Sequence, residues 1–164
     1  MLCIKLFKLV VSRIKRGAKV SNRGKVAAIV QARMGSSRLP GKILKPLAGK
    51  PVLQHVVERL SFCKLLDEII IATTVSNIDD EVELFCQKQE ITCFRGNEED
   101  VLDRYYKAAK KFDVAHVVRI TADCPVIDPV IVDEVIQNYL NGLYDIYALS
   151  GEFPNGLDCS VFRF

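Results

Sequence analysis

The chain has 164 residues, of which 49% are hydrophobic and 26% charged, and its mean hydropathy is slightly positive. This length and composition suit one domain with a substantial hydrophobic core and are short for two domains. No apolar run approaches the roughly 18 residues of a membrane-spanning helix. The low content of Gly and Pro excludes a collagenous or predominantly disordered chain.

Positive charge is concentrated at the N-terminus. Eight of the 23 basic residues and none of the 20 acidic residues lie in residues 1–25, so the rest of the chain has 15 basic against 20 acidic residues. A body with this balance has no general attraction for nucleic acid, and we expect no nucleic-acid partner. Ser21-Asn22-Arg23-Gly24 is typical of a linker. It divides the chain into a basic extension, residues 1–24, and one domain, residues 25–164.

The basic extension has two interpretations. Its leucines and valines fall near one helical stripe, which is the pattern of an amphipathic helix on anionic lipid or of a targeting segment. The alternative, which the linker favours, is a solvated extension. Lys5 and Lys8 interrupt the apolar stretch and exclude a signal peptide, so we expect a cytoplasmic protein. The six cysteines include no C-x-x-C pair and are expected to be reduced thiols rather than zinc ligands.

Short apolar runs alternate with segments of helical periodicity in the body of the chain. Strands are expected at Val26–Val30, Glu68–Ala72, Thr92–Arg95, His116–Thr121 and Asp145–Leu149. Helices are expected at Pro51–Phe62, Asp79–Gln89, Asp100–Phe112 and from Pro129 to about Leu140. Asp128 caps the last of these, with proline in its first turn.

This alternation predicts an α/β fold with a mainly parallel sheet covered on both faces. Right-handed crossovers place the loops that follow the strands along one edge of the sheet, where open α/β sheets bind their ligands. The two most unusual loops of the chain follow the first strand and the strand His116–Thr121. We therefore expect the functional site at that edge.

The loop after the first strand, Gln31 to Lys42, contains three cations, two hydroxyls and two glycines in twelve positions. Arginine forks match phosphate oxygens, lysine adds a mobile charge, and glycines let backbone N–H groups approach a ligand. The spacing is not that of a Walker A loop, because Gly35 and Gly41 are one residue too far apart and Ile43 follows the lysine. These residue types predict a polyphosphate site, with a solvated basic loop as the alternative.

Four segments carry a resemblance to a known family. They are Val-Gln-Ala-Arg-Met-Gly-Ser-Ser-Arg-Leu-Pro-Gly-Lys at 30–42, Gly-Lys-Pro-Val-Leu-Gln-His at 49–55, Phe-Arg-Gly-Asn-Glu-Glu-Asp-Val-Leu-Asp-Arg-Tyr-Tyr at 94–106, and Val-Arg-Ile-Thr-Ala-Asp-Cys-Pro at 118–125. Together they resemble the cytidylyltransferase family. The closest branch is the spore coat polysaccharide biosynthesis protein F type, related to the acylneuraminate and 3-deoxy-manno-octulosonate cytidylyltransferases. The resemblance runs collinearly from Val26 to about Phe162.

The resemblance implies a Rossmann-like, three-layer nucleotide-diphospho-sugar transferase fold. It also implies an enzyme that transfers CMP from CTP to a sugar or sugar acid and releases pyrophosphate, in surface or spore coat polysaccharide biosynthesis. Family members continue well beyond the length of this chain, which is expected to be a C-terminally shortened member. The alternative is a non-catalytic nucleotide-binding or partner-binding remnant. A glycosyltransferase ranks last, because Asp123-Cys124-Pro125 lacks the second Asp of an Asp-x-Asp motif.

The resemblance further implies particular nucleotide-binding residues, which are Ala32, Arg33, Gly35, Ser36, Arg38 and Lys42. Arg33 and Lys42 are implied to be catalytic as well. Asp123 is the third implied catalytic residue and the ligand of Mg²⁺, an ion that prefers oxygen donors. By residue pattern alone, the turn-residue explanation of Asp123 is slightly favoured.

On the sugar side, the resemblance implies that Arg104 and Asp158 bind substrate. Asn155 and Ser160 depart from the family pattern, where a basic and an acidic residue are usual. The implied partners are CTP, a sugar or sugar acid, and a second copy of the chain in a homodimer. His55 and His116 are expected to be packing or surface residues, and Asp128 a structural cap.

Overall fold

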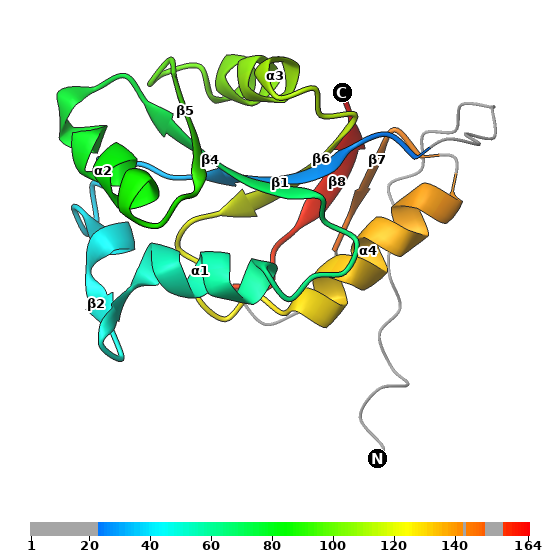
Figure 1. Ribbon diagram of the computed structural model, residues 1–164, viewed down its shortest axis with the longest axis horizontal. Coiled ribbons are helices and arrows are strands. Elements are labelled where there is room, and N and C mark those ends of the chain that lie inside the picture. The colour runs from blue at the N-terminus through cyan, green and yellow to red at the C-terminus, as the bar shows by residue number, and fades with distance from the viewer. Residues whose placement is uncertain (1–22, 143, 150–155) are drawn as a thin grey trace.

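The computed structural model describes residues 23–142, 144–149 and 156–164 (Figure 1). Almost all of the basic extension lies outside these ranges, so its two interpretations both stay predictions. Among the described helices, none is long and apolar enough to cross a membrane. The described cysteines form no disulfide, as expected for free thiols.

A six-stranded sheet forms the centre of the domain, in the order β5-β4-β1-β6-β8-β7. Its strands are β1 (Val26–Gln31), β4 (Glu68–Thr74), β5 (Thr92–Gly96), β6 (His116–Thr121), β7 (Ile146–Ala148) and β8 (Ser160–Arg163). The first four run parallel to one another, and β8 pairs antiparallel with both β6 and β7. The predicted α/β class with a mainly parallel sheet is confirmed.

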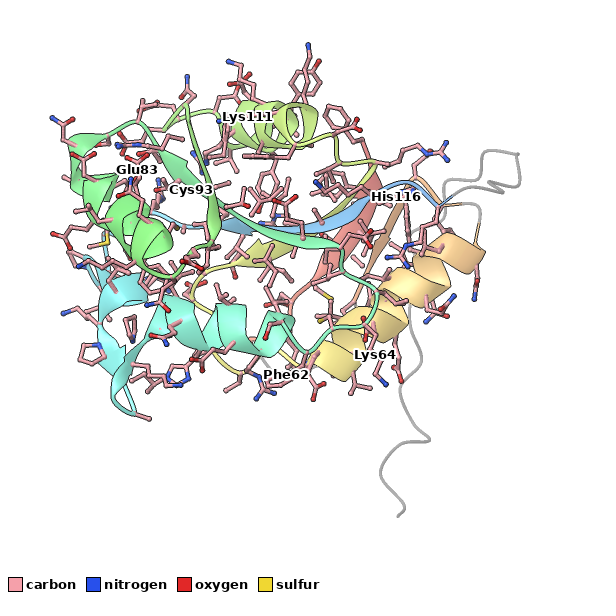
Figure 2. All side chains as sticks on the ribbon, viewed as in Figure 1. Phe62, Lys64, Glu83, Cys93, Lys111 and His116 are labelled. Carbon is pink, nitrogen blue, oxygen red and sulfur yellow. The ribbon has the colours of Figure 1, made fainter. Side chains whose placement is uncertain are left out.

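Helices cover both faces of this sheet and give three layers (Figure 1). The helices are α1 (Val52–Leu60), α2 (Asp80–Lys88), α3 (Val101–Lys111) and α4 (Pro129–Asn141). Side chains of α1, α2 and α4 pack against one face, and side chains of α3 pack against the other. Figure 2 shows this separation, with Lys111 of α3 on one side of the sheet and Phe62 and Lys64, which follow α1, on the other.

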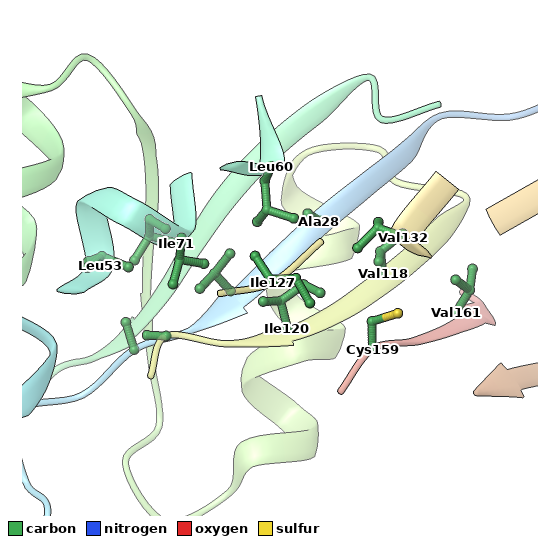
Figure 3. Close-up of a cluster of buried hydrophobic side chains, with 14 of the residues drawn as sticks. Ala28, Leu53, Leu60, Ile71, Val118, Ile120, Ile127, Val132, Cys159 and Val161 are labelled. Atoms are coloured by element: carbon green, nitrogen blue, oxygen red, sulfur yellow. The ribbon is translucent and has the colours of Figure 1, made fainter. Parts of the chain in front are cut away.

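The buried position of β1 explains its uninterrupted apolar sequence. Its alternate residues belong to opposite clusters, Val26, Ala28 and Val30 to the α1/α4 side and Ala27 and Ile29 to the α3 side. All five are fully buried. Figure 3 shows the larger cluster, in which residues from β1, β4 and β6 meet leucines of α1 and a valine of α4. Burial of both faces removes the polar alternation of a half-exposed strand.

A hairpin, a short strand and a 3-10 turn are among the elements that were not predicted. The hairpin of β2 (Pro46–Leu47) and β3 (Lys50–Pro51) follows the loop over residues 31–42, and it ends at Pro51, where the sequence predicted the start of a helix. Its two-residue turn requires positive φ at both positions, and Ala48 is not a residue type that signals such a turn. The other two are the strand β8 and the 3-10 turn η1 (Lys42–Leu44), which are too short for periodicity to reveal.

The strand order reverses direction at the centre of the sheet. From β1 the chain adds β4 and then β5 on one side, and it then crosses over to place β6 on the other side of β1. The loops after β1 and β6 therefore leave the sheet side by side at a topological switch point, where open α/β sheets bind ligands. These are the two loops that the sequence analysis singled out.

Candidate active site

The loop after β1, residues 31–42 and hereafter the β1 loop, is closed on itself by one carbonyl group. The amides of Ser36 and Gly41 both donate to the carbonyl oxygen of Met34, each over 2.9 Å. Gly41 has a φ of 67°, which its missing side chain makes accessible at little cost. Ala32 is fully buried, and its amide donates to the carbonyl of Ala72, so the loop starts from a fixed point on β4.

Lys42 and Asp123 face each other across the switch point. The ammonium group of Lys42, in η1, donates to the carboxylate of Asp123, in the loop after β6. Partial burial raises the pKa of Asp123, but the hydrogen bond and charge of Lys42 outweigh it and hold that pKa below its ordinary value. The carboxylate is therefore ionised at neutral pH. The two residues are both partly exposed, so solvent and a ligand can reach them.

The remaining basic residues of the β1 loop point to solvent. Arg33 and Arg38 are exposed, and neither makes an ion pair within the described ranges. Two guanidinium groups beside an ammonium group provide several strong donors for phosphate oxygens. The hydroxyl of Ser36 accepts from the amide of Leu39 over 3.4 Å, and Gly35 lies between Ile78 and Glu98.

Arg104 lies beneath the site rather than on its surface. Its side chain is fully buried, and one terminal nitrogen donates to the carbonyls of Asn97 and Glu98, over 2.5 and 3.4 Å. Its Nε and other terminal nitrogen are buried and have no hydrogen-bond partner within the described part of the chain. Burial lowers the pKa of this guanidinium, and the nearby charge of Arg33 lowers it further. Substrate contact by Arg104 stays a prediction.

Asp158 is exposed and directly precedes the buried Cys159 that leads into β8. Burial raises the pKa of the Cys124 thiol, and the charges of both Asp123 and Asp158 contribute in the same direction. Both carboxylates are therefore within electrostatic range of the Cys124 thiol. This places Asp158 near the switch point, while its role in binding substrate stays a prediction.

Asp79 was expected only as the first residue of a helix, and the structure places it in the site. It ends the 3-10 turn η2 (Asn77–Asp79), and its buried carboxylate accepts the amide of Met34 over 2.6 Å. Nothing in the local sequence distinguishes it from the acidic residues that commonly begin helices. The feature that indicates such a role is the burial of the carboxylate, and burial depends on the fold rather than on the local sequence.

A magnesium ion fits the donor chemistry at Asp123 only with help from a nucleotide. Among the described residues, no group of three or more His, Cys, Asp or Glu side chains could hold a metal ion. Mg²⁺ is commonly bound through one or two carboxylates, with substrate phosphates and water completing its six ligands. One accessible carboxylate beside a cationic loop suits this arrangement.

The family comparison agrees with the geometry. The family model described as cytidylyltransferase matches residues 27–155. The chain belongs to the cytidylyltransferase family. Within the family, it is 41% identical over 117 residues to the spore coat polysaccharide biosynthesis protein SpsF of Bacillus subtilis, covering 69% of this chain and 49% of that protein.

Two further relatives extend the comparison of this cytidylyltransferase-family chain. It is 37% identical over 112 residues to the 3-deoxy-manno-octulosonate cytidylyltransferase of Geobacter metallireducens, which covers 68% of this chain and 43% of that protein. A solved cytidylyltransferase from Leptospira borgpetersenii superimposes with a TM-score of 0.81 at 37% identity, covering 86% of this chain and 61% of that one. The chain thus spans about half the length of the curated relatives it matches.

Proposed function

We propose that this chain transfers CMP from CTP to the hydroxyl group of a sugar or sugar acid and releases pyrophosphate. The observation that carries the proposal is the contact between Lys42 and Asp123 across the switch point, beside the exposed guanidinium groups of Arg33 and Arg38. A lysine suited to binding phosphate and a carboxylate suited to holding a metal ion lie in contact here. Together they can position a nucleotide and stabilise its charge, which is what nucleotidyl transfer requires of a site.

The proposed reaction is one in-line displacement at the α-phosphorus of CTP. The sugar hydroxyl loses its proton to solvent and forms the new bond to phosphorus as the bond to the pyrophosphate oxygen breaks, so no covalent enzyme intermediate is needed. Arg33, Arg38 and Lys42 hold the β- and γ-phosphates and stabilise the charge that develops on the leaving group. Gly35 and Ser36 contribute the backbone and hydroxyl groups along which the triphosphate lies. Ala32, whose amide donates to Ala72, contributes to nucleotide binding by fixing the start of the loop.

Asp123 is the residue proposed to hold Mg²⁺ near the α-phosphate. When bound, the ion neutralises phosphate charge and polarises the reacting phosphoryl group. Lys42 donates to Asp123 in this structure. If Asp123 held Mg²⁺, the ammonium group of Lys42 would be available to bind the phosphates.

The sugar is assigned by class only. The relatives named for 3-deoxy-manno-octulosonate support a sugar acid, and the relative named for spore coat polysaccharide supports a role in surface polysaccharide biosynthesis. Asp158 is the residue proposed for the sugar side, and Arg104, which is buried beneath the site, is proposed for contact with nucleotide or sugar. A homodimer and a cytoplasmic location stay predictions.

The decisive experiment is calorimetric titration of the purified chain with CTP, ATP, GTP and UTP, each with Mg²⁺. We expect micromolar binding of CTP and at least tenfold weaker binding in Lys42→Ala. In an assay of pyrophosphate release, the same substitution should remove about 2–4 kcal/mol of transition-state stabilisation, by analogy with other charge-stabilising donors.

Lys45→Ala is the matched control. Lys45 is an exposed lysine three residues further along, and its side chain makes no hydrogen bond or ion pair within the described ranges. It should bind CTP as the unmodified chain does. Near-normal binding and turnover by Lys42→Ala would contradict the assignment of the site. Binding of CTP without turnover would restrict the function to nucleotide binding.

A further inference from the structure

The carboxylate of Asp79 is an unusual group for its position. Asp79 is 1% exposed and makes no ion pair with any described residue. A buried carboxylate costs several kcal/mol of desolvation unless its surroundings compensate for the charge. Burial lowers the pKa of Arg104, and the charge of Asp79 partly opposes that effect, so Asp79 and Arg104 are within electrostatic range of each other. The burial of Asp79 therefore needs an explanation in its own hydrogen bonds.

Hydrogen bonds explain how the buried charge is tolerated. One oxygen of Asp79 accepts the amide of Met34 over 2.6 Å. The other oxygen accepts both the hydroxyl and the amide of Thr74, the amide over 3.3 Å. Three donors from two separate segments converge on one carboxylate, and the oxygens bridge the β1 loop to the end of β4.

The segment that carries Asp79 is itself held firmly. Arg95, on the edge strand β5, donates through Nε to the carbonyl of Thr74 and through one terminal nitrogen to the carbonyl of Ser76, both over 2.9 Å. Its other terminal nitrogen contacts the carboxylates of Asp80 and Glu83, over 2.7 and 2.8 Å. Glu83 on α2 lies close to β5 in Figure 2. Asp79 is therefore a fixed point relative to the sheet.

The β1 loop, in contrast, stands beside an open groove. A groove of about 630 Å³ has Met34, Gly35 and Pro40 on one wall and Ile78 and Glu81 on the other. The hydrogen bond from Met34 to Asp79 joins these two walls. Since the carbonyl of Met34 closes the loop through Ser36 and Gly41, one anchor at Met34 orients every group that the loop presents to a ligand.

We propose that Asp79 is a positioning residue for triphosphate binding, which holds the β1 loop in its phosphate-binding shape through the amide of Met34. The proposal rests on the proposed function of that loop. Asp79 does not touch substrate in this account. Its buried negative charge acts on an anionic ligand only through the loop geometry that it maintains.

A carboxylate is the group that this position requires. An ionised Asp has two acceptor oxygens and no donor, whereas Asn has one acceptor oxygen and an NH₂ group that only donates. Asn at position 79 can accept from Met34 or from the Thr74 amide but not from both. A buried amide without its acceptor is costly, so the loop or the end of β4 must move.

The test compares Asp79→Asn with Asp80→Asn in the full chain, by titration with CTP and with CMP in the presence of Mg²⁺. Both substitutions remove one negative charge near the loop, which by electrostatics alone should tighten binding of an anion. Positioning predicts the opposite sign for Asp79→Asn, at least a tenfold loss of CTP affinity. Asp80 is exposed, and Arg95 also contacts Glu83 and two backbone carbonyls, so Arg95 keeps these contacts when Asp80 is replaced. Asp80→Asn should therefore bind CTP as tightly as the unmodified chain or more tightly.

The nucleotide series separates positioning from general loss of structure. The β1 loop is assigned to the β- and γ-phosphates, which CMP lacks, so Asp79→Asn should change CMP affinity by less than about twofold. Equal losses for CTP and CMP, or CTP affinity that is unchanged or improved, would overturn the proposal. If Asp79→Asn fails to fold, Thr74→Val provides a second test, because it removes the hydroxyl donor to Asp79. Thr74→Val should weaken CTP binding but not CMP binding, whereas Thr74→Ser keeps a hydroxyl group and should bind CTP as the unmodified chain does.

Amide hydrogen exchange in the unliganded protein provides a readout that does not depend on CTP. Exchange at Met34 and Gly41 should be at least tenfold faster in Asp79→Asn than in Asp80→Asn, with exchange at buried amides of β1 unchanged. If the unmodified chain does not bind CTP, the proposed function fails, and the exchange rates still decide whether Asp79 holds the loop. Unchanged exchange at Met34 would overturn the positioning role.

Discussion

His116 is a buried titratable residue at the amino end of β6, away from the switch point. It is 5% exposed, and its Nδ1 lies 3.1 Å from the hydroxyl of Tyr139 on α4. The two rings meet edge to face with their centroids 5.5 Å apart. Figure 2 shows His116 at the end of the sheet beside α4. These contacts support the expected packing role of this histidine.

Burial of His116 predicts that stability depends on pH. Burial lowers its pKa below the ordinary 6.5, and the charges of Arg163 and Arg23 lower it further. Below pH 6.5 the unfolded chain therefore binds a proton that the folded chain does not, and the free energy of unfolding falls as pH decreases toward the folded pKa. The slope from one histidine is at most about 1.4 kcal/mol per pH unit.

Urea unfolding between pH 7.5 and 5 measures this dependence. His116→Gln should flatten the curve in that range, since glutamine does not titrate. Tyr139→Phe retains the titrating histidine and serves as the control that keeps the slope. A slope that is identical in His116→Gln and the unmodified chain would assign it to other groups.

At the scale of single elements, α4 begins with the cap that the sequence predicted. The carboxylate of Asp128 accepts the amides of Val130 and Ile131, over 2.8 and 3.4 Å, and Pro129 occupies the first turn. The cap fixes where α4 starts and therefore how its buried face, which includes Val132 and Val135, meets the sheet. Asp128 is a helix cap, whereas Asp123, only five residues earlier, is the proposed ligand of Mg²⁺.

Removal of this cap should cost a measurable part of the stability without affecting nucleotide binding. We expect Asp128→Ala to lower the free energy of unfolding by about 1 kcal/mol, the usual cost of replacing a helix N-cap by alanine. Asp128→Asn keeps a side-chain oxygen for the same amides and should remain close to the unmodified chain. Chemical denaturation and CTP titration of both variants test this, and a loss of CTP affinity in Asp128→Ala would contradict a purely structural role.

At the scale of the whole molecule, the fold brings a cation and a carboxylate 81 positions apart into contact. A ligand that binds only the folded chain stabilises it by mass action, by about 2.7 kcal/mol at a concentration one hundred times its Kd. For a domain of this size, each kcal/mol raises Tm by about 2–4 °C. CTP with Mg²⁺ should therefore raise Tm measurably in a thermal scan.

The same scan identifies the route of stabilisation. Lys42→Ala should lose most of the rise in Tm produced by CTP, and Lys45→Ala should retain it. An equal rise in both variants would place the nucleotide elsewhere on the molecule.

Elements with a local pattern could be predicted from the sequence. The apolar run of β1, the periodicity of the four helices and the cap at Asp128 each depend on neighbouring residues, so the strands and helices were predicted to within a few positions. The sequence also indicated the family, because the segment around Arg33, Arg38 and Lys42 is contiguous. The roles of these residues in nucleotide binding follow from the resemblance and stay predictions.

Contacts between residues far apart in the sequence could be identified only from the folded structure. The short strand β8, the burial of Arg104 and the bond between Asp79 and Met34, 45 positions apart, depend on strand order and on how the loops settle at the switch point. Local propensity does not include such contacts, because they stabilise the protein only when segments far apart in the sequence pack together and exclude water. An acid at the start of a helix and an acid that holds an active-site loop are the same residue type in the sequence. Burial, which is a property of the fold, distinguishes them.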